Sequence, residues 1–198
     1  MKLGRVQPRK STEIGGCSSY LFLAVILLMA SLISADGHSA EIQDASSGLK
    51  IELGENWREM PKNVPIKFLV GCTNPKCGDK TRSFINTNFD RQLQQARTEK
   101  FLSMVPASQF PSMVRQMLGR MGKIEKTIEV KPFKIGDKRG YIGKFYIRYV
   151  DGRERYLVYA VTFDRGWFYH FQIFGEKGFE VAVDKFGQEL LSGVSILR

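Results

Sequence analysis

Hydrophobic and polar residues alternate with a period of two over much of the region from residue 123 to residue 174. Such alternation is typical of strands that bury one face, and the Asp151-Gly152 pair between two of these runs favours a two-residue hairpin turn. The run ERYLVYAVTF (154–163) is apolar on both faces, which predicts a central strand covered on both sides. We expect a meander of antiparallel strands here, and further strands at 49–53, 57–61, 66–72 and 81–88.

Three other stretches repeat their hydrophobic residues at helical spacing. The stretch at 111–121 has Pro111 in its first turn and Gly122 as its stop, and Gly193 follows the stretch at 176–192 as its stop. We expect the short final segment, 194–197, to add an edge strand. The predicted helices cover residues 90–104, 111–121 and 176–192. Together these elements predict one α+β domain, in which helices flank a twisted antiparallel β-sheet.

The first forty residues follow the three-part pattern of a secretory signal peptide. Four basic residues between Lys2 and Lys10 precede an uncharged apolar run from Tyr20 to Ile33, and small and polar residues follow. This run has 14 residues, whereas a spanning helix needs about 20, so a signal peptide is favoured over a permanent anchor. Because no paired arginines precede the run, the general secretory route is favoured.

Signal cleavage divides the chain into three predicted parts. Residues 1–40 are the signal peptide, 41–48 are a flexible lead-in, and 49–198 are the single domain. We expect the mature protein to be periplasmic or secreted, with no permanent membrane span.

The predicted mature chain is basic. Of the 30 basic and 20 acidic residues, four basic and two acidic ones precede residue 41, which leaves a formal net charge of +8. Eight basic residues lie between residues 115 and 139, where only three acidic residues oppose them. We call these eight the basic stripe: Arg115, Arg120, Lys123, Lys126, Lys131, Lys134, Lys138 and Arg139.

A basic stripe on one edge of a sheet attracts polyanions. In the cell envelope the candidate partners are an anionic lipid, an anionic glycan or an acidic envelope protein. Export disfavours nucleic acid as a partner. The competing interpretation is a solvated surface that keeps a small exported protein soluble.

Two cysteines remain in the predicted mature chain, Cys72 and Cys77, on either side of the turn-prone sequence Thr-Asn-Pro-Lys. In an oxidising compartment they are expected to form a local, structural disulfide. A thioredoxin-type redox site has two intervening residues rather than four. A zinc site would lack ligands, because His170 is the only mature histidine. Cys17 precedes the apolar run, so it is no candidate for a lipid-bearing N-terminus.

No catalytic motif is present: the chain has no nucleophile elbow, phosphate-binding loop, dinucleotide fingerprint or zinc-protease signature. His170 shares a predicted strand face with Phe168, Gln172 and Phe174, where a histidine is more often packed than catalytic. The sequence therefore favours a non-catalytic binding or assembly module without cofactor or metal. The alternative is an enzyme of unrecognised type that uses His170 with a nearby carboxylate.

Three stretches of the chain resemble the PsbP-like superfamily, which includes the extrinsic subunit P of photosystem II, Ran-binding Mog proteins and small exported bacterial proteins. They are LKIELGENWREMP (49–61), GDKRGYIGKFYIRYVDGRERYLVYAVTF (136–163) and FEVAVDKFGQELLSGVSIL (179–197). The resemblance implies an α/β/α sandwich around an antiparallel sheet, in a family of mostly non-enzymatic binding or assembly proteins. The loop between Cys72 and Cys77 is not part of the family pattern. Fold alone does not give function.

The signal peptide generates the first testable prediction. We expect N-terminal sequencing of the protein recovered from its native cell fraction to begin between Asp36 and Glu41, because small residues follow the short apolar run. Full-length chain with residues 1–40 intact in washed membranes would contradict a cleavable signal.

Overall fold

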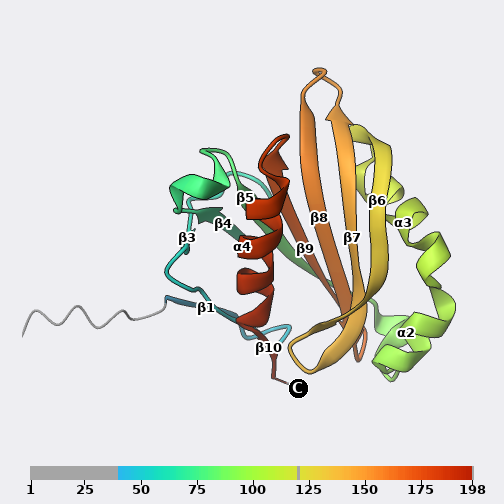
Figure 1. Cartoon of the computed structure of the whole chain (residues 1–198). Helices are drawn as coiled ribbons and strands as arrows, with labels where there is room; N and C mark the ends of the chain where they lie inside the picture. The colour runs from blue at the N-terminus through green and yellow to red at the C-terminus, as the bar shows by residue number, and fades with distance from the viewer. Residues whose placement is uncertain (1–39, 120, 198) are drawn as a thin grey trace, which may run out of the picture. The chain divides into compact units, whose positions relative to one another are not determined.

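The protein is described by a computed structural model over residues 40–119 and 121–197 (Figure 1). The signal-peptide prediction falls on residues outside this range, apart from Ala40. Arg120 of the basic stripe also lies outside it. None of the described helices is long and apolar enough to cross a membrane.

A seven-stranded antiparallel sheet forms the centre of the domain. Its order is β3-β4-β5-β9-β8-β7-β6, so β6, β7, β8 and β9, which follow one another in the chain, are successive neighbours in the sheet. The predicted meander is therefore confirmed. A hairpin also forms at Asp151-Gly152, but its loop is longer than the two residues expected, because the Tyr149 amide donates to the Arg153 carbonyl. The strands are β3 (Trp57–Glu59), β4 (Phe68–Cys72), β5 (Arg82–Phe89), β6 (Gly122–Ile135), β7 (Lys138–Tyr149), β8 (Glu154–Asp164) and β9 (Trp167–Glu176).

Helices cover both faces of this main sheet, which gives the predicted α/β/α arrangement. The helix α4 (Glu180–Ser192) packs on β8 and β9 from one side. On the other side α2 (Thr98–Met104) contacts β7 and β8, and α3 (Phe110–Leu118) contacts β6 and β7. The separate short turns of 3-10 helix are η1 (Pro75–Cys77), η2 (Arg91–Leu93) and η3 (Ala107–Gln109).

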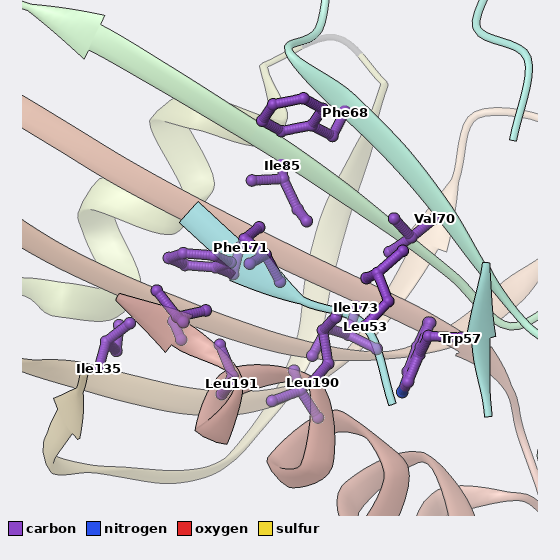
Figure 2. Close-up of a cluster of buried hydrophobic side chains, with 14 of the residues drawn as sticks. Leu53, Trp57, Phe68, Val70, Ile85, Ile135, Phe171, Ile173, Leu190 and Leu191 are labelled. Carbon is purple, nitrogen blue, oxygen red and sulfur yellow. The ribbon is translucent and has the colours of Figure 1, made fainter. Parts of the chain in front are cut away.

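A hydrophobic core fills the space between α4 and the main sheet (Figure 2). Trp57 at the start of β3 is 3% exposed and donates its indole N–H to the Phe186 carbonyl, at 2.9 Å. Leu190 of α4 and Ile173 of β9 are fully buried in the same core. Burial of side chains this size stabilises the fold by about 1.5–3 kcal/mol each, so α4 is held by its apolar face.

A second, three-stranded sheet closes one end of this core. It consists of β1 (Glu41–Asp44), β2 (Leu49–Glu52) and β10 (Val194–Ile196), in the order β1-β2-β10. The predicted final strand is confirmed, although it pairs with β2 rather than with the main sheet. The prediction of a flexible lead-in at 41–48 is wrong, because these residues form β1 and its turn. This segment is ordered because the Ile42 side chain, which is only 5% exposed, packs in the hydrophobic core.

The helix predicted at 90–104 is shorter than expected. Only Thr98–Met104 is α-helical, because the chain before it is bound to the turn between β8 and β9. The Asp90 amide donates to the Gly166 carbonyl and the Ala96 carbonyl accepts from the Arg165 amide, at 2.7 and 3.0 Å. These bonds hold Arg97 in an extended conformation.

The prediction that Gly122 stops the next helix is also wrong. That helix ends at Leu118, and Gly119 follows with a φ of 55°, a conformation that glycine adopts without steric cost. Gly122 is instead the first residue of β6. The alternation of side chains between the two faces of β6 is interrupted twice, by irregularities in its pairing with β7 after Ile124 and after Thr127. Ile128 is consequently exposed.

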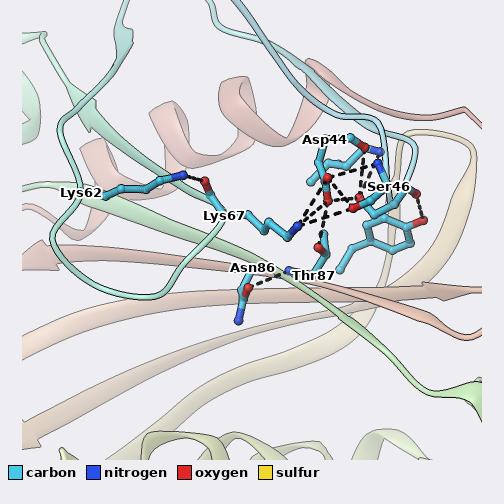
Figure 3. A network of polar contacts seen from close by, with 9 residues as sticks. Asp44, Ser46, Lys62, Lys67, Asn86 and Thr87 are labelled. Carbon is cyan, nitrogen blue, oxygen red and sulfur yellow. Dashed lines mark hydrogen bonds and ion pairs between the residues drawn. The ribbon is translucent and has the colours of Figure 1, made fainter.

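Asp44 links β1 to the main sheet through a partly buried polar network (Figure 3). Its carboxylate accepts hydrogen bonds from the Ser46, Ser47 and Thr87 hydroxyls at 2.6, 2.6 and 3.2 Å, and lies 3.4 Å from the Lys67 ammonium. Burial alone would raise the pKa of Asp44, but these partners outweigh it and hold the pKa well below its usual range.

Replacing Asp44 with asparagine tests this network. Since the folded-state pKa lies below the unfolded value of about 3.9, the carboxylate stabilises the fold above roughly pH 4 and loses that contribution as the pH falls. We expect Asp44→Asn to lower the free energy of unfolding by about 2 kcal/mol at neutral pH, and by less at pH 3. Urea unfolding at both values measures this, with Asp79→Asn at an exposed position as control. Equal losses at both pH values would contradict the assignment.

Candidate anion-binding site

The register of β6 divides the basic stripe between two faces of the sheet. Directly paired residues of antiparallel strands point to the same side. Lys126 pairs with Tyr146 and Lys131 with Ile142, on the α4 side. Lys134 pairs with Arg139 on the side of α2, where both line the same hollows. The stripe is therefore not one continuous surface.

On the α4 side, acidic residues compensate most of the positive charge. Lys123 lies 3.1 Å from Glu125, and Lys131 lies 2.8 Å from Glu129. Hydrogen bonds from these two lysines hold the pKa of each glutamate below its usual value. Exposed pairs of this kind stabilise little, but they leave little net charge to attract an anion. Lys126 has no such partner among the described residues, and neither does Arg115 on the exposed side of α3.

The other part of the stripe borders a hollow of about 430 Å³ between three turns. The hairpin of β6 and β7 contributes Lys134 and Arg139, the residue before α2 is Arg97, and the turn between β8 and β9 contributes Arg165. We call this the basic hollow. Its full lining is Arg97, Thr98, Glu99, Lys134, Asp137, Lys138, Arg139, Asp164 and Arg165.

Lys138 has a structural role in the basic hollow. It lies 3.0 Å from Asp137 and 3.5 Å from Asp164, which is 5% exposed. The hydrogen bond to Asp137 raises the pKa of Lys138 above its ordinary value, and the Asp164 charge adds to this effect. The lysine therefore compensates these carboxylates instead of offering its charge to a ligand.

The remaining four basic residues of the hollow make no ion pair with any described acidic residue. Arg97, Lys134, Arg139 and Arg165 are all exposed. Arginine presents its N–H donors as a planar fork that matches carboxylate and phosphate oxygens. The basic hollow thus has the charge and the donors to hold an anionic group.

Arg165 is held in an unusual backbone conformation. The two-residue turn Arg165-Gly166 has φ values of 47° and 85°. Turns of this type prefer asparagine, aspartate or glycine at the first position, because a larger side chain is strained there. Strained residues of this kind cluster at functional sites. The turn alone would favour another residue at this position, so the arginine side chain is the candidate reason for Arg165.

An apolar hollow of about 440 Å³ adjoins the basic hollow and shares Lys134 and Arg139 with it. Its apolar walls come from Leu102 of α2 and from Pro132 and Tyr141 of the β6–β7 hairpin. The complete lining is Leu102, Pro132, Phe133, Lys134, Arg139, Gly140 and Tyr141. Two positively charged side chains therefore separate a polar space from an apolar one.

His170 lies away from both hollows, against the rings of Tyr159 and Phe168. The Tyr159 hydroxyl is 2.6 Å from Nδ1 of His170. Burial lowers the pKa of His170 to about 4, so the ring is neutral at neutral pH. No carboxylate in the described part of the chain makes a hydrogen bond or ion pair with it. This geometry gives no support to a histidine–carboxylate catalytic pair.

Cys72 and Cys77 form the predicted disulfide, with Cα atoms 6.4 Å apart. Cys77 is fully buried in the core between α4 and the main sheet, whereas Cys72 is only partly buried at the end of β4. Within residues 40–119 and 121–197, no group of three histidine, cysteine, aspartate or glutamate side chains is placed to hold a metal ion.

No protein-family model matches the chain, and no curated protein matches its sequence. Solved structures match its fold. Cyanobacterial PsbP (CyanoP) from Synechocystis sp. PCC 6803 aligns with a TM-score of 0.55 at 10% identity, over 82% of this chain and 95% of that protein. LpqN of Mycobacterium tuberculosis, described as involved in cell envelope biogenesis, aligns with a TM-score of 0.52 at 9% identity, over 80% and 90% of the two chains.

A third structure, from Bacteroides thetaiotaomicron, aligns with a TM-score of 0.52 at 10% identity, over 81% of this chain and 49% of that one. At such identities the likeness concerns the fold. The class is α+β, with helices on both faces of an antiparallel sheet. Within that class the fold is PsbP-like, which confirms the resemblance found in the sequence.

Sequence reasoning missed Arg97 and Arg165, because each lies far along the chain from residues 115–139. The Asp-Arg-Gly sequence at 164–166 was a usable signal: an arginine in the first turn position where asparagine is favoured. Arg97 gave no signal, since it falls within the helix that the spacing predicted.

Substitutions at Arg165 test whether the strained turn destabilises the fold independently of the arginine charge. Because asparagine tolerates a positive φ, we expect Arg165→Asn to raise the free energy of unfolding by about 1 kcal/mol. Urea unfolding measures this. Arg165→Lys keeps both the charge and the strain and should change stability by less than about 0.5 kcal/mol. A destabilised Arg165→Asn variant would mean that the arginine supports the fold.

Proposed function

We propose that this chain is an exported, non-catalytic envelope module that binds an anionic amphiphile. The observation that carries the proposal is the adjacency of the basic hollow and the apolar hollow through Lys134 and Arg139. A ligand with a charged head and an apolar part fits both spaces. An anionic lipid has this composition.

The charge distribution favours the head group at Arg97, Arg139 and Arg165. These side chains lack acidic partners in the described structure, and phosphate and carboxylate oxygens accept arginine's paired donors. An acyl or glyceryl group next to the head would then contact Leu102 and Pro132, which replaces water on apolar surface. A purely polar glycan would leave the apolar hollow wet, which is why we favour a lipid.

Other observations support export and an envelope location. The disulfide between Cys72 and Cys77 is typical of an oxidising compartment. One fold relative, LpqN, is described as involved in cell envelope biogenesis. The absence of catalytic motifs and the neutral, tyrosine-bound His170 support binding rather than catalysis.

Binding to lipid vesicles tests the proposal. We expect the protein to sediment with phosphatidylcholine vesicles that contain phosphatidylglycerol and to stay in solution with phosphatidylcholine alone. The variant Lys134→Glu/Arg139→Glu should bind at least about tenfold more weakly, because each basic residue near an anionic membrane contributes about 1 kcal/mol. Added salt should weaken binding of the unaltered protein.

A matched control carries the same change of net charge elsewhere. Lys126→Glu/Lys185→Glu alters two exposed lysines on β6 and α4, outside both hollows. It should retain most of the binding. An equal loss of binding in both variants would show that only net charge matters, and would contradict a binding site at the two hollows. Equally strong binding to a soluble acidic glycan would contradict an amphiphilic ligand.

A further inference from the structure

A second polar hollow lies beside the disulfide loop, near β3 and β4, at the opposite edge of the main sheet from β6. Its volume is about 300 Å³, and it is formed by β3, β4, the start of β5 and the turn of η1. It shares no residue with the basic hollow or the apolar hollow. The lining is Arg58, Met60, Gly71, Cys72, Thr73, Asn74, Pro75, Gly78, Asp79 and Arg82. We call it the loop hollow.

Two arginines flank a glycine across three strands in the loop hollow. Arg58 of β3 and Arg82 of β5 both pair with Gly71 of β4, so all three lie in one row on one side of the sheet. With neighbouring strands 4.7–4.9 Å apart, the two arginine Cα atoms are separated by about 10 Å. That spacing allows two long side chains to reach one group bound in the hollow that both line.

Gly71 makes room for the Met60 side chain, which lies over it in the loop hollow. A Cβ atom at this position would overlap the Met60 sulfur and lie 3.4 Å from Nη1 of Arg82. Glycine within a strand weakens it and often marks a close approach by another group. Here that group is the Met60 side chain, which lines the hollow together with Arg58 and Arg82.

Both guanidinium groups have donors to spare. Arg82 donates one bond from Nη1 to the Thr81 carbonyl, at 2.9 Å, and Arg58 is exposed. Neither forms an ion pair with a described acidic residue. Asp79 is the one acidic residue in the lining, so the charge of the hollow remains positive.

The wall opposite the arginines is fixed before any ligand arrives. The disulfide closes the loop from Cys72 to Cys77, and Asn74 accepts a hydrogen bond from the Lys76 amide at 3.0 Å. The Asn74 side chain also donates to Asn56, at 2.8 Å. Since a rigid wall loses little freedom on binding, more of the interaction energy appears as affinity.

We infer that the loop hollow is a binding site for a phosphate group. One arginine satisfies the two oxygens of a carboxylate, whereas two arginines on opposite sides match the larger number of oxygens on a tetrahedral phosphate. The phosphate can be free or part of a larger molecule such as a lipid head group. This inference does not rest on the lipid binding proposed for the basic hollow, which uses other residues.

Titration with inorganic phosphate, followed by amide chemical shifts, tests the site in the protein purified from the cell fraction where it accumulates. We expect saturable shifts centred on residues 71–82. Because each arginine would donate charge-assisted hydrogen bonds to the phosphate oxygens, Arg58→Gln and Arg82→Gln should each raise the dissociation constant about tenfold or more. Arg91→Gln, on exposed η2, is the matched control and should leave it unchanged.

The outcomes separate this site from the basic hollow. Lys134→Glu/Arg139→Glu should retain the phosphate response at residues 71–82, while Arg58→Gln/Arg82→Gln should retain vesicle binding. Glycerol phosphate that competes with inorganic phosphate would support a small-molecule source, and competition by phosphatidylglycerol vesicles alone would support a membrane source. Absent shifts at residues 71–82, or equal weakening in the Arg91→Gln control, would overturn the inference. Unchanged spectra elsewhere in each variant verify that it folds.

Discussion

The strand β8 imposes the main constraint on this domain, because every residue from Tyr156 to Asp164 is buried. A strand buried on both faces is stable only when each side of its sheet is covered by another layer. Here α4 and the small sheet cover one side, and α2 and α3 cover the other. The two halves of the core therefore share β8 and depend on each other, so neither layer can be lost without exposing the same strand.

Elements with a clear period were predicted well from the sequence. The meander, its Asp151-Gly152 turn and α4 each depend on local patterning and local turn chemistry, which the chain displays directly. The errors at residues 41–48 and 90–97 concern segments that are ordered by distant contacts. Residues 41–48 are polar and small, yet Ile42 and Asp44 tie them to partners that lie far along the chain.

The candidate site was predicted only in part, for a similar reason. Lys134, Lys138 and Arg139 lie in one hairpin, so counting charges along the sequence found them. The irregularities in the register of β6 then set the direction of each lysine and separated Lys126 from Lys134. Arg97 and Arg165 join the site only because the segment before α2 binds the β8–β9 turn, and such a tertiary contact has no signature in a single sequence.

The strand β6 also lies at the edge of the main sheet, with one long side that no described strand covers. An open edge of this length is a template for association with other copies of the chain. Two irregularities in register, the missing amide proton of Pro132 and a row of lysines all oppose such pairing. The lysines of β6 thus oppose pairing of this edge with another copy of the chain. Neutralising Lys126 and Lys131, which lie outside the basic hollow, would promote such pairing even where the fold and the candidate ligand site are intact.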